Sequence, residues 1–239
     1  MKWYLCSIIA HQDLERSDLT LCQAREYWCL FQASSPGSAY TKSLGLGAKL
    51  TIAQPARRWI LDGLSDLLLV AESPAPDSEI LWSERELSPR EINTLVRPME
   101  QWRAFSVSGA RLQANGWYIC QIILEEVHDT GAHGDSVLVW INWHLVEADG
   151  PESARAKALH LGKAHETSRN SHRCDGDLAH WEFRGLRDLI PTIDPPGDGA
   201  TLWFEEFTVA AEELMQLVVK RSDLTVFSSG EGGVVDSRK

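Results

Sequence analysis

Aromatic and β-branched residues open the chain in an arrangement typical of a β-strand. Residues 3–9 have the sequence Trp-Tyr-Leu-Cys-Ser-Ile-Ile, and such side chains suit the pleated surface of a sheet. Residues 117–123 have the sequence Trp-Tyr-Ile-Cys-Gln-Ile-Ile, so five of seven positions are identical 114 residues later. Two such openings predict that one domain pattern occurs twice in the chain.

Further matches between the two halves follow in the same order. They pair residues 28–33 with 143–148, residues 63–67 with 185–189, and residues 81–84 with 202–205. The offset between partners changes by only a few residues, as insertions in loops between fixed elements would produce. The sequence therefore predicts a tandem duplication, with repeat 1 at residues 1–108, repeat 2 at residues 113–227, and a disordered tail rich in Ser and Gly at residues 228–239.

Hydrophobic and polar residues are arranged in the same way along each predicted repeat. Alternation every two residues predicts two strands before the first helix and two strands after it. Ser35-Pro36 is typical of the start of the first helix, and the capping box Ser88-Pro89-Arg90-Glu91 of the start of the second. Each repeat is therefore predicted to be a β-β-α-β-β-α unit, an α+β fold in which both helices cover one face of an antiparallel sheet.

Length and composition fit two domains and a protein without a membrane span. The 239 residues allow two domains of about 110 residues each. No apolar run approaches about 18 residues, and the N-terminus enters a strand without a secretory leader. The five cysteines are odd in number and have no Cys-x-x-Cys spacing, which favours reduced thiols and a cytoplasmic location.

The formal net charge of −11 lies almost entirely in the second half of the chain. Residues 1–112 contain 12 Lys and Arg against 13 Asp and Glu, whereas residues 113–239 contain 11 against 21. This excess of acid disfavours nucleic acid as a partner, because binding to phosphates needs a basic surface. It suits a basic protein partner, while the simpler explanation, that acid keeps the protein soluble, stays open.

No cluster of residues has the spacing of a known catalytic or metal site. Seven of the eight histidines lie in the second half, without zinc-finger or His-Glu-x-x-His spacing, so no metal and no cofactor is predicted. A Gly-x-Ser-x-Gly nucleophile motif is absent from the sequence. The adjacent carboxylates Glu125-Glu126 and Glu205-Glu206 point to opposite faces of their strands, which favours solvent-facing side chains over an acid–base pair.

Eight of the ten tryptophans recur at matching positions and are predicted to pack in the cores: Trp3, Trp28, Trp59, Trp82, Trp117, Trp143, Trp181 and Trp203. Trp140 is different, because it aligns with Arg25 in the first half and lies on the opposite strand face from Trp143. An aromatic residue outside the repeated pattern suits a binding anchor, since Trp is enriched at binding hot spots.

Four motifs that occur in both halves carry a resemblance to a known family. They are the Trp-Tyr openings, Leu-x-Leu-Gly at residues 44–47 and 159–162, Gly-Leu-x-Asp-Leu, and Leu-Trp-x-Glu. Together they resemble a family of small bacterial domains of unknown function whose members begin with Trp-Tyr. Small, acidic, tandem α+β proteins of this kind are also similar to immunity proteins, which neutralise a cognate toxin of an interbacterial secretion system. The resemblance implies a non-enzymatic protein and no catalytic residues.

The first hypothesis is a cytoplasmic immunity protein that binds a toxin domain directly, with no nucleic acid and no membrane as partner. Its acidic second repeat would face the toxin, and the predicted partner-binding residues are Glu125, Glu126, Asp129, Asp135 and Trp140. Two alternatives stay open. One is a small-ligand-binding or phage-derived regulatory domain with a pocket between the repeats, and the other is a metal-dependent hydrolase that uses the histidines of the second repeat.

Overall fold

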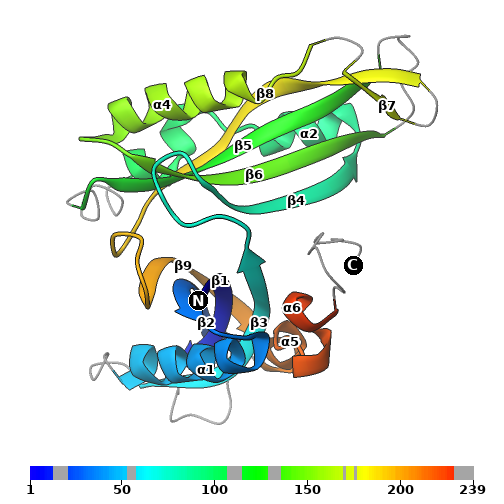
Figure 1. Cartoon of the computed structure of the whole chain (residues 1–239). Helices are drawn as coiled ribbons and strands as arrows, with labels where there is room; N and C mark the ends of the chain where they lie inside the picture. The colour runs from blue at the N-terminus through cyan, green and yellow to red at the C-terminus, as the bar shows by residue number, and fades with distance from the viewer. Residues whose placement is uncertain are drawn as a thin grey trace. The chain divides into compact units, whose positions relative to one another are not determined.

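The computed structural model describes residues 1–12, 21–52, 58–106, 115–128, 136–168, 171–174 and 177–228. The chain divides into two compact units (Figure 1). Among the described residues, unit 1 consists of residues 1–73 and 193–228, and unit 2 lies within Pro74–Thr192. Unit 1 is thus built from two segments that are far apart in the sequence, and unit 2 from the segment between them. The tail predicted at residues 228–239 lies outside the described residues apart from Ser228, which ends the last helix.

Unit 1 is a four-stranded antiparallel sheet with the strand order β3-β1-β2-β9. Its elements are β1 (Lys2–Gln12), β2 (Leu21–Ala33), α1 (Pro36–Ile52), β3 (Trp59–Val70), β9 (Ala200–Ala210), α5 (Ala211–Leu217), η4 (Arg221–Asp223) and α6 (Thr225–Ser228). The first three strands come from the start of the chain, and the fourth strand comes from its end.

Unit 2 is a five-stranded antiparallel sheet with the strand order β4-β6-β5-β8-β7. Its elements are β4 (Glu79–Leu87), α2 (Pro89–Leu95), η1 (Met99–Gln101), η2 (Arg103–Phe105), β5 (Trp117–His128), β6 (Val137–Glu147), α4 (Pro151–Ala164), β7 (His172–Cys174) and β8 (Asp177–Pro191). The capping box predicted at residues 88–91 is present at the start of α2.

In each sheet, one edge strand comes from the half of the chain that supplies the other sheet's central strands. Strand β4 follows β3 in sequence but pairs with β6, and β9 follows β8 but pairs with β2. The compact units therefore cut across the segments predicted as repeats 1–108 and 113–227. Those boundaries describe similarity within the sequence, and they stay a prediction.

The predicted fold class is wrong. Strands predominate, and each of the two sheets has helices on both faces rather than on one. In unit 1, Tyr4 and Ile8 of β1 pack in the core beneath α1, whereas Ile9 packs with Leu214 of α5 on the other face. In unit 2, Ile122 lies in the core beneath α4, and Ile123 packs with Ile92 of α2.

Burial of the central strands on both faces explains this error. All seven residues from Tyr4 to Ala10 in β1 are buried, as are all nine from Tyr118 to Glu126 in β5. A strand that is covered on both sides needs no alternation of apolar and polar residues. The uniform apolar runs at the two Trp-Tyr openings were therefore compatible with two covered faces.

Each sheet has a bulge around a glycine on the strand next to its opening strand. Gly63 in β3 has φ +157° and Gly185 in β8 has φ +143°, and the pairing register shifts at both places. A Cβ on Gly63 would come within 2.5 Å of Val218, and one on Gly185 within 2.7 Å of Val96. Val218, the residue after α5, therefore packs against the bulge at Gly63, and Val96, the residue after α2, packs against the bulge at Gly185.

The eight recurring tryptophans are all at least half-buried, and Trp59, Trp181 and Trp203 are fully buried. Among the described helices, none is long and apolar enough to cross a membrane.

Candidate functional site

Two of the predicted partner-binding residues, Glu125 and Glu126, are adjacent on β5. Both residues are buried, so the interpretation of this pair as solvent-facing is wrong, whereas Glu205 and Glu206 are exposed as predicted. The Glu125 carboxylate accepts a hydrogen bond of 2.6 Å from Arg184 Nε on β8, and Arg184 also lies 3.0 Å from Glu182. The hydrogen bond that Arg184 donates to Glu125 is the main cause that raises the pKa of the Arg184 guanidinium.

Glu126 points to the other face of the sheet and has its own partner. Its Oε1 lies 2.7 Å from His172 Nε2 on β7, and the His172 ring stacks on Trp181 at 5.8 Å between ring centroids. The carboxylates of Glu125 and Glu126 therefore both have partners within unit 2. Asp129 and Asp135, predicted for the same surface, lie outside the described residues.

Trp140 lies within a stack of rings rather than projecting from the surface. Its centroid is 4.1 Å from that of Trp181 and 5.6 Å from that of Trp82. The indole Nε1 donates a hydrogen bond of 2.9 Å to Glu84 of the neighbouring strand β4. The residue is half-buried, and its ring faces and its polar atom are occupied by neighbours within unit 2.

Unit 1 has the same arrangement around Arg25, with a cation in place of the indole. The Arg25 guanidinium lies 4.3 Å from the ring centroid of Trp59 and 4.8 Å from that of Phe204. It also pairs with Glu206 of β9 at 2.7 Å, and Glu206 is its direct cross-strand partner, as Glu84 is of Trp140. Each sheet thus holds one flat group between two aromatic rings and beside a carboxylate.

The ion pair of Glu125 also has a counterpart in unit 1, with the charges reversed. His11 near the end of β1 lies 2.8 Å from Asp62, and Asp62 precedes the bulge glycine of β3 as Arg184 precedes that of β8. Burial raises the pKa of Asp62, and the contact with His11 partly offsets this. A polar cross-strand contact at this place thus belongs to both sheets.

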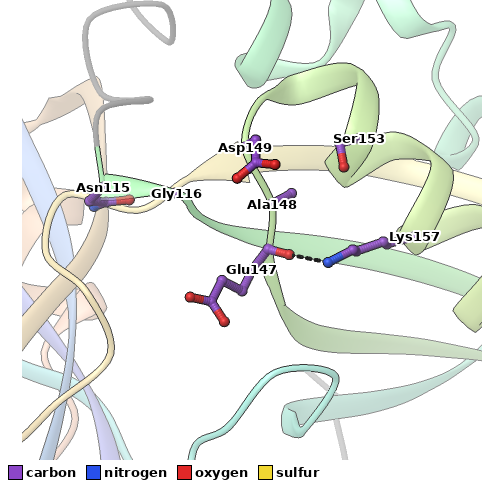
Figure 2. Close-up of a pocket in the computed structure, with 7 residues that line it drawn as sticks. All are labelled: Asn115, Gly116, Glu147, Ala148, Asp149, Ser153 and Lys157. Atoms are coloured by element: carbon purple, nitrogen blue, oxygen red, sulfur yellow. Dashed lines mark hydrogen bonds between the residues drawn. The ribbon is translucent and has the colours of Figure 1, made fainter.

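A polar pocket of about 530 Å³ lies at the start of α4 (Figure 2). Its lining residues are Asn115, Gly116, Glu147, Ala148, Asp149, Ser153 and Lys157. Lys157 Nζ donates a hydrogen bond of 2.6 Å to the carbonyl oxygen of Glu147, which ties α4 to the end of β6. The Asn115 amide group donates to Thr192. The lining consists mainly of polar and charged side chains, so the pocket suits binding of a polar ligand.

The corresponding lysine of unit 1 has an additional partner. Lys42 Nζ donates to the carbonyl oxygen of Gln32 at 3.1 Å and also pairs with Asp198 at 2.6 Å. Asp198 also accepts a hydrogen bond from the backbone of Gln32, and these contacts lower the pKa of its carboxyl group. The open space beside Lys157 is therefore a feature of unit 2, where no aspartate among the described residues forms an ion pair with this lysine.

The histidines of the second half do not form a metal site of the usual composition. In the part of the chain that the structure describes, no three His, Cys, Asp or Glu residues are placed to hold a metal ion together. The residues that contact the predicted site could not be recognised from the sequence pattern: Glu84, Trp181, His172 and Arg184. The signal that could have found Arg184 was the charge reversal between matching positions of the two halves, because His11 and Asp62 face Glu125 and Arg184 in the sequence alignment.

Comparison with known proteins gives one family match. Residues 117–203 match the family described as a domain of unknown function, DUF4288. Neither the curated proteins nor the solved structures include a match. The matched segment starts with β5 and ends inside β9, so it continues from unit 2 into unit 1. This segment of the chain is thus similar to a small domain of unknown function.

Proposed function

We propose that the protein is a non-enzymatic binding protein that neutralises a cognate bacterial toxin by direct contact, as immunity proteins do. The observation that carries this proposal is an acidic surface on α5 and β9, which replaces the surface predicted around Glu125. The buried carboxylates of unit 2 pair with residues of the same unit: Glu125 with Arg184, Glu126 with His172, and Asp188 with Arg103. The carboxylates of α5 are instead exposed.

This acidic surface consists of Glu205, Glu212, Glu213 and Met215. The three residues on α5 are exposed, and the Met215 side chain is 67% exposed. Glu205 is exposed and lies on the same face of the sheet as α5, because Phe207, two residues further along β9, packs in the cluster that contains Leu214. Carboxylates around an exposed apolar side chain suit a basic partner with an apolar contact at its centre.

The distribution of charge over the units supports the same surface. Residues 1–73 contain seven Lys and Arg and seven Asp and Glu, so the first part of unit 1 has no net charge. Residues 193–228 contain two against seven, a net charge of −5. The net negative charge of residues 1–73 and 193–228 together therefore comes entirely from the second segment, which contains β9 and α5.

The test is binding to a candidate toxin domain sought among the products of neighbouring genes, measured by titration calorimetry at low and at physiological salt. The variant Glu212→Lys/Glu213→Lys should weaken binding at least tenfold, and the loss should shrink as salt increases. Glu86→Lys/Glu100→Lys is a matched control, because both residues are exposed in unit 2 and the change in net charge is the same. Equal affinity of the first variant and the wild type would rule out this surface, and a neighbouring gene product that does not bind would rule out the immunity function.

We also propose that the chain arose by tandem duplication. The matched bulges at Gly63 and Gly185 and the matched ion pairs before them support this origin. A further pair of equivalent contacts joins Val219 N to Leu64 O and Arg97 N to Leu186 O, at 2.9 and 3.2 Å. A survey of relatives tests the idea: single-copy proteins that end after one β9-like strand should exist, and their complete absence would count against it.

A second candidate, a small-ligand-binding domain, is favoured by the pocket beside Lys157. Its carboxylates, Glu147 and Asp149, suit a ligand with hydrogen-bond donors or positive charge. Thermal-shift measurements with spermidine test it. A stabilisation that disappears in Glu147→Gln/Asp149→Asn would support the pocket as a binding site, and an unchanged melting temperature of the wild type would exclude this ligand class.

A further inference from the structure

Strand β9 forms one edge of the sheet in unit 1 and pairs with β2 along one side (orange in Figure 1). Backbone N–H and C=O groups of an antiparallel strand point alternately to its two sides, so about half of those in β9 point away from β2. Of the strands that the structure describes, none pairs with this outer side between Glu206 and Ala210. An edge of this kind can accept a further strand.

The other sheet edges in the described part of the chain are covered, short or mixed in charge. On the outer side of β3, Leu64 O accepts a hydrogen bond of 2.9 Å from Val219 N, and Asp66 accepts one of 3.1 Å from Thr225 N. Strand β7 has three residues, and β4 carries Arg85 between two glutamates. Strand β9 is thus the described edge that is both long and free of basic residues.

The charge around β9 indicates which kind of strand it suits. Residues 200–219 contain four Glu and no Lys or Arg. Glu206 is exposed and contacts Arg25 through one carboxylate oxygen, Oε2, at 2.7 Å. A carboxylate accepts several hydrogen bonds, so Glu206 can pair with a second basic side chain on an incoming strand.

The two faces of β9 differ in polarity along the same stretch. Phe207 and Val209 pack in the cluster that contains Leu214 of α5, whereas Glu206 and Thr208 are exposed on the opposite face. A strand placed beside β9 extends both faces of the sheet. Its residues next to Phe207 and Val209 should therefore be apolar, and those next to Glu206 should be basic.

We propose that the outer edge of β9, from Glu206 to Ala210, binds a β-strand of a partner protein in which apolar residues alternate with Lys or Arg. This inference rests on the proposed function, because it states how a basic partner contacts unit 1 beside the acidic surface. Backbone hydrogen bonds supply affinity, and the alternate side chains supply specificity. A second copy of this chain suits the edge poorly, because it brings the same glutamates together.

The test uses synthetic peptides and does not involve a toxin. An eight-residue peptide of alternating Lys and Val is titrated into the full-length protein at low salt, and its affinity is measured by calorimetry. One control peptide has the same composition in a scrambled order, and another is N-methylated at every backbone amide, so it cannot donate backbone hydrogen bonds. We expect the alternating peptide to bind at least tenfold more tightly than either control.

Hydrogen exchange locates the bound peptide. Binding should slow the exchange of alternate backbone amides between Glu206 and Ala210 at least tenfold, because their outward N–H groups gain partners. Glu206→Lys should weaken binding of the alternating peptide at least fivefold. Glu86→Lys is the matched control, since Glu86 is exposed on the edge strand β4 and the change in charge is the same, and it should bind the peptide as the wild type does.

Glu206→Gln keeps the test decisive if Glu206→Lys fails to fold, because it removes the charge and keeps the shape of the side chain. Equal affinity for the three peptides would overturn the proposal, since net charge alone would then explain binding. A dimer of the protein alone in ultracentrifugation, with these amides already protected, would overturn it in favour of a second copy. Failure of the peptide to bind would overturn strand addition at β9 and would leave the toxin contact on α5 to its own test.

Discussion

Arg25 in unit 1 and Trp140 in unit 2 occupy the same place in two sheets that share the order of four strands, β3-β1-β2-β9 and β8-β5-β6-β4, yet one is a cation and the other an indole. Both are flat, both lie between two aromatic rings, and both form a hydrogen bond to a glutamate on the outer strand. At this place both sheets hold a planar hydrogen-bond donor, and the fold tolerates a change of its charge. The feature that set Trp140 apart in the sequence therefore has a structural explanation.

The side-chain pairs next to these groups also differ in charge while they keep their place in the fold. His11 with Asp62 and Glu125 with Arg184 have opposite polarity, but each joins an opening strand to the residue before a bulge glycine. The polar contact is common to both sheets, and the sign of each partner is not.

The largest effect is expected from removing the flat groups. Trp140→Ala should destabilise the protein by about 2–4 kcal/mol, somewhat less than for a fully buried Trp, because two ring contacts and a hydrogen bond are lost. Arg25→Ala should cost only about 1–2 kcal/mol, since its partner Glu206 is partly exposed and regains water. Urea unfolding followed by circular dichroism measures both, and equal losses would contradict the assignment of Trp140 to the core.

A smaller loss is expected from Glu125→Ala. This change leaves Arg184 without its main partner, but Arg184 is 40% exposed and keeps Glu182 at 3.0 Å. We expect about 1–2 kcal/mol, less than for a fully buried pair. Glu182→Ala is the control and should cost less than 1 kcal/mol, which is about the value of exposed pairs. A loss of toxin binding in Glu125→Ala without a loss of stability would return this residue to the binding surface.

The pH dependence of stability should distinguish unit 2 from unit 1. Burial lowers the pKa of His144 and His165 from the usual 6.5, so the unfolded chain takes up protons at a pH at which the native state does not. Stability that is fully present above about pH 6.5 should therefore be lost as the pH falls below it. His165→Leu has the residue that α1 carries at the matching position, Leu50, and its melting temperature should fall less between pH 7.5 and pH 5.5 than that of the wild type. An identical fall in both proteins would contradict the prediction.

The smallest effect is expected from exchanging the flat groups themselves. Arg25→Trp introduces into unit 1 the residue of unit 2, and an indole nitrogen replaces the guanidinium as donor to Glu206. The free energy of unfolding should change by less than about 1 kcal/mol, because ring contacts and one hydrogen bond are kept. Calorimetry on this variant sharpens the comparison, and a loss as large as that of Arg25→Ala would show that the charge itself is needed.

Local features of the fold could be predicted from particular residues. Ser88 and Glu91 form the predicted capping box, and the runs at Trp3 and Trp117 lie in strands. The faces of those strands could not be predicted, because β5 is covered on both sides and even adjacent carboxylates are buried there. The partners of Glu125 and Glu126 lie 59 and 46 positions away along the chain, separations that no local pattern specifies.

The sequence by itself determined the aromatic and apolar runs, the helix cap, the net charge and the residues by which the halves differ, Trp140 and the histidines. Only the tertiary structure decided that β4 pairs with β6 and β9 with β2. The physical reason is that strand pairing uses backbone hydrogen bonds, which are the same for every residue, so the pattern along β4 suits the edge of either sheet. That choice moves the acidic segment 193–228 into unit 1, and it determines which carboxylates are buried with a partner and which lie exposed on α5.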